Sequence, residues 1–407
     1  MKNNFIFSLA SNLIVSGSKF LVLYILIKLS TPREVGNYNY ALVMTAPIFL
    51  LLSLKIRTVQ TTNDNYNFNE CNSLIIIINL LALNIITLIL FINSNAYIGA
   101  ILLLVAIMKF IDNLREVVYG VFQRNEKIKY ISKSLIYYNL ISTLYFSLTF
   151  LLTKSLIISL FAMLIVSILF YIFYDLFFLF NEHQVKYKLI LNTIKFKEIL
   201  MISLPLSFSS ALGSLNDTIP RMFLKNFYGS YELGIFSSIA YFLIIASLIA
   251  NALSQVFLPR LSLLYREKKF NDFIKLSNKL LTLGIFIGIF IVVITFIIGK
   301  TFLVLIYGEL YAKYYVALII LSIGIMFILS GVFVGTILTS MKIYNIHYKI
   351  VVFVLISNCI LSFIFIPVYS IYGAATSACI TQLITLLLYV YFYKKNIGGL
   401  IYEKNTK

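Results

Sequence analysis

The sequence predicts an all-α membrane protein whose chain crosses the bilayer many times. Of its 407 residues, 61% are hydrophobic and only 12% are charged, and the mean hydropathy is +0.96. A soluble protein is about half apolar and about one quarter charged. Apolar runs of about twenty residues recur from end to end, and each can cross a hydrocarbon core about 30 Å thick. The alternating ten-residue segments that are typical of a membrane β-barrel are absent.

Hydropathy and loop chemistry separate the apolar runs into twelve helices. The first run follows Met1 and Lys2 and looks like a signal peptide, but it is too long and lacks a small-residue cleavage site. We therefore assign it as the first helix. Polar or basic segments bound each later run, and the longest of these segments are 181–198 and 259–277. The first six expected helices span residues 5–29, 37–54, 73–93, 96–121, 131–152 and 155–180. The other six span residues 199–225, 232–257, 278–299, 314–340, 344–366 and 371–393.

The basic residues predict the orientation of these helices. Of the 33 lysines and arginines, 23 lie in or beside the loops and tails on the side of the N-terminus, and six lie on the other side. Because cytoplasmic loops are enriched in Lys and Arg, both termini are expected inside. The net charge of +18 therefore reflects membrane orientation, and we expect no nucleic-acid partner. The expected organisation is one lobe at 1–180, a cytoplasmic linker at 181–198, and a second lobe with a short cytoplasmic tail at 199–407.

The two halves of the chain resemble each other. Glu34-Val-Gly36 matches Glu232-Leu-Gly234 at an offset of 198, and each stands where an outer loop enters a helix. The segment at 120–129 matches that at 335–344 at an offset of 215. Six helices per half is an even number, so the halves share one orientation. This parallel repeat predicts two pseudo-symmetric six-helix lobes, and it is typical of transporters.

Two predicted helices carry a row of polar side chains on one face. In helix seven the spacings are 4, 3, 4, 3 and 4, which correspond to a single helical face. Helix one has a similar row, and the offset of 198 aligns the two. The rows are Ser203, Ser207, Ser210, Ser214, Asp217 and Arg221 in helix seven, and Ser8, Asn12, Ser16 and Lys19 in helix one. We interpret both rows as the lining of a hydrated cavity between the halves.

Charged side chains within the spans need an explanation, because each costs about 2.5–3.5 kcal/mol at a helix centre on insertion scales. Lys19 and Asp217 could instead form a neutral pair that joins the halves. Arg221 lies close to the outer end of its helix and could extend to the interface. For Asp175 and Glu198, which stand near cytoplasmic helix ends, we expect interfacial positions.

The fourth predicted helix contains a second group of charges. Lys109 lies about thirteen residues from either end, which places it near the bilayer centre at a rise of about 1.5 Å per residue. Lys109, Asp112 and Glu116 share a face, and Arg115 can contact Asp112 at i+3. The group could be a network that is satisfied within its own lobe, or it could face the substrate path.

No catalytic chemistry is indicated by the remaining residues. The two histidines, His183 and His347, are 164 residues apart, and the three cysteines have no metal-ligand spacing. The segment at 299–301 resembles the end of a P-loop, but Ile294 occupies the position of its first glycine. We therefore expect no enzyme, no catalytic residue and no metal site.

Several segments together carry a family resemblance that covers nearly the whole chain. They are EVGNY at 34–38, YELGIF at 231–236 after Asp217, PRLSLLY at 259–265, GTILTSMK at 335–342 and IPVYSIYGAATSACITQ at 366–382. In these segments the chain resembles the polysaccharide flippases of the multidrug/oligosaccharidyl-lipid/polysaccharide exporter superfamily, in particular those that flip O-antigen or capsule repeat units.

The resemblance implies a MATE-like V of two six-helix lobes around a cationic cavity. It implies a monomer in the bacterial cytoplasmic membrane, surrounded by lipids, with a polysaccharide polymerase as a further partner. The implied substrate is an undecaprenyl-pyrophosphate-linked oligosaccharide that moves to the outer leaflet by alternating access. The implied pyrophosphate ligands are Lys19, Arg221, Lys109 and Arg115, and the implied coupling residues for Na⁺ or H⁺ are Asp217, Asp112 and Glu116. Beyond this coupling ion no cofactor is expected.

The sequence is also compatible with two other functions. A multidrug or organic-cation antiporter has the same fold, but its site would favour a net negative charge, whereas acids and bases balance here. A membrane polysaccharide polymerase or ligase would act on the same lipid carrier. Such enzymes resemble one another in having a large outer loop with basic residues, and the predicted outer loops are all short.

Overall fold

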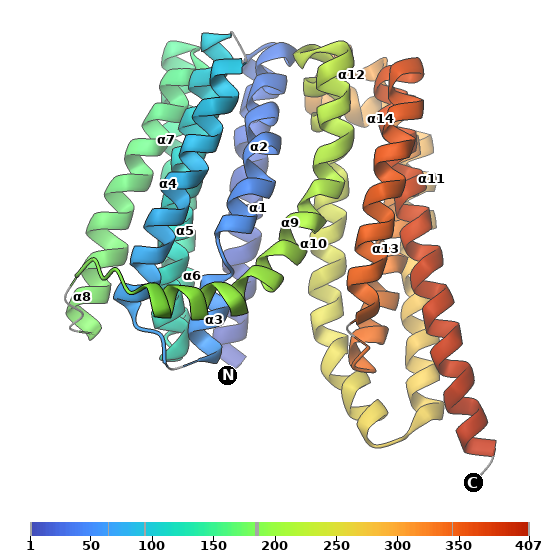
Figure 1. Cartoon of the computed structure of the whole chain (residues 1–407). Helices are drawn as coiled ribbons and strands as arrows, with labels where there is room; N and C mark the ends of the chain where they lie inside the picture. The colour runs from blue at the N-terminus through green and yellow to red at the C-terminus, as the bar shows by residue number, and fades with distance from the viewer. Residues whose placement is uncertain (1, 64, 93–94, 184–186, 344, 406–407) are drawn as a thin grey trace. The chain divides into compact units, whose positions relative to one another are not determined.

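A computed structural model describes residues 2–405 except 64, 93–94, 184–186 and 344, with the backbone alone at 2–6, 8–9, 89–92, 183, 345 and 397–405. Every regular element in this part of the chain is a helix (Figure 1). Eleven of the described helices are long and apolar enough to cross a membrane. The protein is thus a multi-pass membrane protein. The chain forms two compact units, Met1–Leu215 and Asn216–Lys407, whose boundary falls inside one long helix.

The first unit is built around one central helix, α5 (Ala96–Arg124), which packs against α2, α3, α4 and α7. Its side chains at the contacts are mostly apolar, and Ile101, Val105 and Val117 are completely or almost completely buried. The other elements are α1 (Lys2–Leu29), α2 (Pro32–Leu52), α3 (Ile56–Thr62), α4 (Phe68–Ile92), α6 (Ile128–Thr153), α7 (Leu156–Phe170), the π-helical turn η1 (Tyr171–Leu176), α8 (Phe177–His183) and most of α9 (Thr193–Tyr228).

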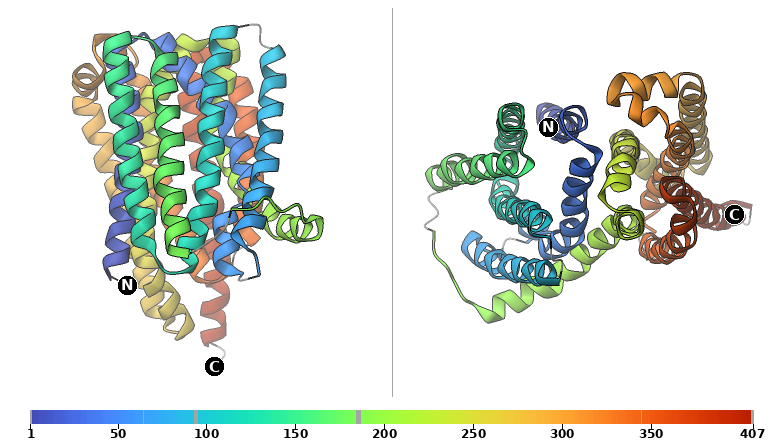
Figure 2. Two further views of the ribbon diagram at one scale, coloured as in Figure 1. Left: turned by 90° about the vertical axis from the view of Figure 1, so that its left-hand side faces the viewer. Right: turned by 90° about the horizontal axis from the view of Figure 1, so that it is seen from above.

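The second unit is also built around its fourth membrane helix, α13 (Tyr315–Ser340), which packs against α10, α11 and α14. Buried side chains of α13 such as Phe333 and Ile337 join those of α10 and α11 in the core. The other elements are the end of α9, α10 (Ser230–Arg266), α11 (Phe270–Tyr307), the short α12 (Glu309–Ala312) and α14 (Asn345–Asn405). The right-hand view of Figure 2 shows most helices of each unit nearly end-on. Both units therefore place the corresponding helix of the repeat at their centre.

The first half of the sequence repeat explains how α2 begins. Thr31 is the N-cap, and its hydroxyl accepts a hydrogen bond from the backbone N–H of Glu34 at 3.4 Å. Pro32 follows at the first helical position, where a missing N–H costs little. The Glu34 carboxylate accepts a bond of 2.7 Å from the hydroxyl of Tyr97, at the start of α5. The segment that contains Glu34 thus begins α2 and connects it by a hydrogen bond to the neighbouring helix α5.

A break between α2 and α3 differs from the sequence prediction, which places a loop at 55–72. Leu54 and Lys55 both adopt left-handed backbone conformations, with φ of 52° and 45°. The chain turns there and continues as α3, which packs against α5. This turn brings the residues that follow it back to the helical core instead of leaving them in a loop.

A second break explains the difference between twelve predicted helices and eleven observed ones. Ser370 has φ of 51° and ψ of −124°, which interrupts α14 between its two parts. A Cβ atom at Gly373 would lie 2.2 Å from the carbonyl oxygen of Phe365, so only glycine fits at this close approach. The two parts correspond to the predicted helices at 344–366 and 371–393, and counting them separately gives twelve.

Candidate substrate pocket in the N-terminal unit

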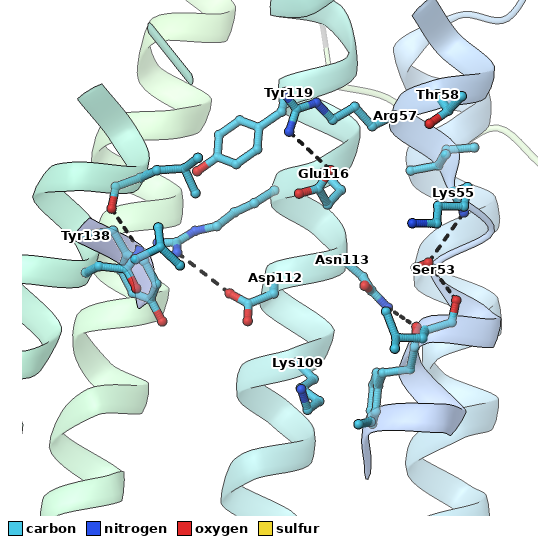
Figure 3. A pocket seen from close by; sticks show the side chains of 18 of the residues that line it. Ser53, Lys55, Arg57, Thr58, Lys109, Asp112, Asn113, Glu116, Tyr119 and Tyr138 are labelled. Carbon is cyan, nitrogen blue, oxygen red and sulfur yellow. Dashed lines mark hydrogen bonds and ion pairs between the residues drawn. The ribbon is translucent and has the colours of Figure 1, made fainter. Parts of the chain in front are cut away.

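A pocket of about 600 Å³ lies in the first unit between α1, α2, α3, α5 and α6. We call it the N-terminal pocket. It is lined by one face of α5, on which Lys109, Asp112, Glu116 and Tyr119 follow one another (Figure 3). Five of the seven charged residues that the sequence predicts to act on substrate or coupling ion line this pocket. They are Lys19, Lys109, Arg115, Asp112 and Glu116.

The charges that line the N-terminal pocket are mainly positive. The cations are Lys19, Lys55, Arg57, Lys109 and Arg115, and the carboxylates are Asp112 and Glu116. Each carboxylate lies near an arginine: Asp112 is 3.8 Å from Arg115, and Glu116 is 3.7 Å from Arg57. Both carboxylate side chains are 41–54% exposed, so these pairs are weak. The two arginines nevertheless offset the two carboxylates, and three lysines remain.

None of these three lysines forms an ion pair with a described residue. Lys109 stands in the middle of a membrane helix and is half-buried. An ammonium group at that depth requires an anionic partner or a hydrated path. The N-terminal pocket therefore carries lysine charges that have no described counter-charge at ion-pair distance.

Arg115 is held by its own unit. Its side chain is 3% exposed, and its Nε lies 3.1 Å from Oδ2 of the buried Asp175. The guanidinium also stacks on the ring of Tyr138, with 3.6 Å between Cζ and the ring centroid, and donates to the carbonyl of Ser167 at 3.4 Å. The guanidinium is therefore held within its own unit, and Arg115 supports the wall of the pocket more than it offers itself to a ligand.

Asp175 lies in the interior and not at the interface that the sequence suggests. It belongs to the π-helical turn η1, a wider turn that rotates the side chain toward α5 and α6. Ser134 donates to its Oδ1 at 2.5 Å, and Tyr119 in turn donates to Ser134 at 2.7 Å. The general tendency of intramembrane charges to pair could have indicated a partner for Asp175. That the partner is Arg115 depends on the π-helical turn, and the spacing of residues in the sequence does not predict this turn.

Lys55 and Arg57 are pocket residues that the sequence reasoning places in a loop. The left-handed turn at 54–55 directs the chain back to α5, where the Arg57 Nε donates to Gln123 at 2.6 Å. Arg57 also lies over the ring of Tyr119, 5.8 Å from its centroid. In the sequence, both cations stand directly after a predicted membrane span. Cations at that position are equally typical of an ordinary cytoplasmic loop, so the sequence alone does not indicate a pocket.

The other two predicted charges, Asp217 and Arg221, belong to the second unit, whereas Lys19 belongs to the first. Asp217 is exposed and Arg221 is half-buried, and no ion pair joins them within the described chain. Beside them, Asn358 donates its amide to the backbone carbonyl of Asn216 at 2.7 Å and accepts from Ser362 at 3.3 Å. The carboxylate of Asp217 is thus accessible next to a group of polar atoms.

The polar rows are only partly exposed. Ser203 and Ser207 are completely buried and donate to carbonyls of their own helix, so they do not line an open cavity. Ser210 is half-buried and donates to the carbonyl of Leu206, and the Oγ of Ser214 is buried without a described hydrogen-bond partner. In helix α1, Asn12 is exposed and Ser16 donates to its carbonyl at 2.9 Å. The side chain of Ser8 lies outside the described residues.

Among the described residues, no group of three His, Cys, Asp or Glu side chains lies close enough together to hold a metal ion.

Solved structures of transporters share this fold. The structure described as "Lipid II flippase MurJ, inward closed conformation" aligns with a TM-score of 0.78 at 16% identity, over 96% of this chain and 87% of that one. An inward-facing multidrug resistance MATE family transporter of the MOP superfamily aligns with a TM-score of 0.71 at 12% identity, over 98% and 95%. These two likenesses show the fold of the chain.

Sequence comparison identifies the family. The profile of a family described as "Polysaccharide biosynthesis protein" matches residues 1–265. The chain is also 42% identical over 395 residues to the "Capsular polysaccharide biosynthesis protein CapF" of Staphylococcus aureus, which covers 97% of this chain and all of that protein. The chain belongs to the polysaccharide biosynthesis protein family.

Proposed function

We propose that the protein is a flippase for a lipid-linked oligosaccharide. Its substrate is an undecaprenyl-pyrophosphate-linked repeat unit, which it moves from the inner to the outer leaflet of the cytoplasmic membrane by alternating access. Both termini lie in the cytoplasm. The observation that carries the proposal is a set of three lysines that line the N-terminal pocket and form no ion pair with a described residue: Lys19, Lys55 and Lys109.

The charge of the pocket matches the charge of such a substrate. A diphosphate linkage brings about two negative charges into a membrane, where they require cations or water. Hydrogen bonds between ammonium groups and phosphate oxygens are about twice as strong as neutral ones. The excess of cations over carboxylates in the N-terminal pocket supplies such partners, and it disfavours the organic cations that a multidrug antiporter would carry.

The family and the fold support the same proposal. The Staphylococcus aureus relative is described as a capsular polysaccharide biosynthesis protein, which favours a capsule repeat unit as cargo. The MurJ structure is described as a flippase of a lipid, so this helix arrangement serves that kind of transport in another protein. A polymerase or ligase would instead need catalytic groups, and no described cluster has the arrangement of an active site.

An ion gradient is proposed to drive the cycle. The candidate coupling residue in the second unit is Asp217, because its carboxylate is exposed within a membrane helix and has no described ion-pair partner. Asp112 and Glu116 are further candidates, although both already lie near arginines. Either H⁺ or Na⁺ is compatible with a carboxylate at such a position.

The test of the proposal is the substitution Lys109→Met, which keeps an unbranched side chain of similar length and removes its charge. Loss of one charge-assisted contact, worth about 1.5–3 kcal/mol, lowers export about tenfold or more. Surface polysaccharide is measured in a deletion strain that expresses the variant, together with the amount of protein in the membrane. The matched control is Lys133→Met, an exposed lysine of the same unit outside the pocket. Normal export by the Lys109→Met protein would refute the proposal.

A further inference from the structure

The second unit contains a pocket whose lining is polar but uncharged. It has a volume of about 390 Å³ and lies between α10, α13 and α14. We call it the C-terminal pocket. Its described lining contains hydroxyl, amide and imidazole groups but no Lys, Arg, Asp or Glu, in contrast to the N-terminal pocket. Polar side chains gathered on one side of membrane helices mark a hydrated or ligand-filled space, since lipid would leave them without partners.

Hydrogen bonds hold the ring of His347 in one wall of this pocket. The hydroxyl of Thr339 donates to the carbonyl of Gly335 at 2.8 Å, so its oxygen accepts from Nε2–H of His347 at 3.1 Å. In an uncharged ring the other nitrogen, Nδ1, accepts from the hydroxyl of Tyr389 at 3.1 Å. This arrangement satisfies both nitrogens of an uncharged imidazole. The ring is therefore a positioned part of the wall.

Other polar groups of the C-terminal pocket retain capacity for a ligand. The amide of Gln382 forms no hydrogen bond with a described residue, so it offers both donors and an acceptor. Asn251 donates to the carbonyl of Ser247 at 2.7 Å, which leaves its side-chain oxygen as an acceptor. Thr336 donates to the carbonyl of Val332 at 2.8 Å and can accept from a ligand. Donors and acceptors without charge are the groups that recognise hydroxyl-rich molecules.

Aromatic rings and small residues complete the site. Phe327 and Tyr389 present apolar surface to the pocket, and the chain contains no tryptophan that could serve instead. Gly331 and Gly335 stand one turn apart on α13 and leave the space open. A Cβ atom at Gly335 would lie 3.5 Å from the ring of Tyr389 and 3.6 Å from that of His347. The volume falls within the range of about 300–1,000 Å³ that is usual for small-molecule sites.

We propose that the C-terminal pocket is a saccharide-binding site for an uncharged hexose or N-acetylhexosamine residue of the transported oligosaccharide. The absence of charge in its described lining disfavours a phosphate or a metal cation as the occupant. The inference rests on the proposed function for the origin of its ligand. The site is the C-terminal pocket instead of the N-terminal pocket, and the part of the substrate that it binds is the sugar instead of the pyrophosphate.

The experiment measures saccharide binding to the purified full-length protein by saturation-transfer NMR. The probes are the methyl glycosides of glucose and N-acetylglucosamine, and pyrophosphate binding is measured in parallel by titration calorimetry. The double substitution Thr336→Val and Gln382→Leu removes two hydrogen-bonding groups, so saccharide affinity falls about tenfold or more while pyrophosphate binding is unchanged. Lys109→Met is expected to weaken pyrophosphate binding and to leave saccharide binding unchanged. Thermal unfolding confirms that each variant is folded.

The chain offers a close control for the threonine. Thr282 on α11 also donates to a carbonyl one turn earlier in its helix, at 2.9 Å, but it is exposed and outside the pocket. Thr282→Val should leave saccharide binding unchanged. Gly331→Leu, which fills the pocket without removing a polar group, should abolish it. The inference is overturned if neither glycoside binds the wild-type protein, or if both bind the double variant as tightly as the wild type. In either case the pyrophosphate titration still tests the proposed function independently.

Discussion

At the scale of single residues, the N-terminal pocket separates charges that hold the fold from charges that are left for a ligand. Arg115 is enclosed by Asp175, Tyr138 and a backbone carbonyl, whereas Lys109 contacts no described carboxylate at ion-pair distance. Helical spacing predicts that Lys109 and Asp112 share a face. It cannot predict that Asp175, far along the chain, completes the partner set of Arg115.

Removal of the partner of Arg115 should destabilise the first unit. Asp175→Asn leaves the buried guanidinium without its counter-charge, and breaking such a pair costs about 3–5 kcal/mol. Thermal unfolding of the purified variant should show a clear decrease in stability. Asp112→Asn serves as the control, because that carboxylate is 54% exposed and 3.8 Å from the same arginine, so its loss costs less than about 1 kcal/mol. Equal stability losses in both variants would contradict the assignment of Asp175 as the structural partner.

Asp217 tests ion coupling at a single carboxylate. An asparagine at this position can neither release a proton nor neutralise a bound cation, so Asp217→Asn should make transport insensitive to an imposed H⁺ or Na⁺ gradient. The measurement is transport in vesicles between pH 6 and 8, with and without a sodium gradient. Asp272→Asn, an exposed acid in the first turn of α11, should respond like the wild type. A gradient response of Asp217→Asn that equals the wild-type response would exclude this role.

At the scale of helices, the spans could be predicted well and the breaks within them only in part. Apolar runs and basic loops identify the membrane helices because length and hydropathy alone decide whether a segment spans the bilayer. The break in α14 was also visible in the sequence, from Pro367 and the small residues after it. The turn at 54–55 and the π-helical turn at 171–176 were not, because tertiary packing imposes both on residues without glycine or proline.

The break in α14 depends on one glycine. Gly373→Ala would place a methyl group about 2 Å from the carbonyl oxygen of Phe365, and backbone atoms cannot move aside cheaply in a packed unit. We expect the variant to lose at least about 1–3 kcal/mol of stability, which lowers the unfolding temperature and the yield in the membrane. Gly324→Ala in α13 is the control, because its Cβ would meet only ordinary contacts from 3.6 Å. Equal stability of the two variants would show that the break relaxes.

At the scale of the whole molecule, the internal repeat predicted the architecture and the family resemblance predicted its class. Each unit is organised around its fourth membrane helix, as a parallel repeat requires. The sequence comparison confirms the family. The distribution of charge within the site could not be predicted in full, because α3 adds Lys55 and Arg57 to the pocket through a turn that hydropathy does not reveal.

The central claim is that the protein moves a pyrophosphate-linked oligosaccharide lipid between leaflets, and leaflet accessibility tests it most directly. Purified protein is reconstituted into vesicles whose lipid-linked repeat units carry a label that an impermeant glycosidase can remove. With wild-type protein and an ion gradient, the fraction of label that the glycosidase removes should rise above the value in protein-free vesicles. With Lys109→Met that fraction should stay near the protein-free value, and with Lys133→Met it should match the wild type. An accessible fraction that the wild-type protein leaves unchanged would contradict the proposed function.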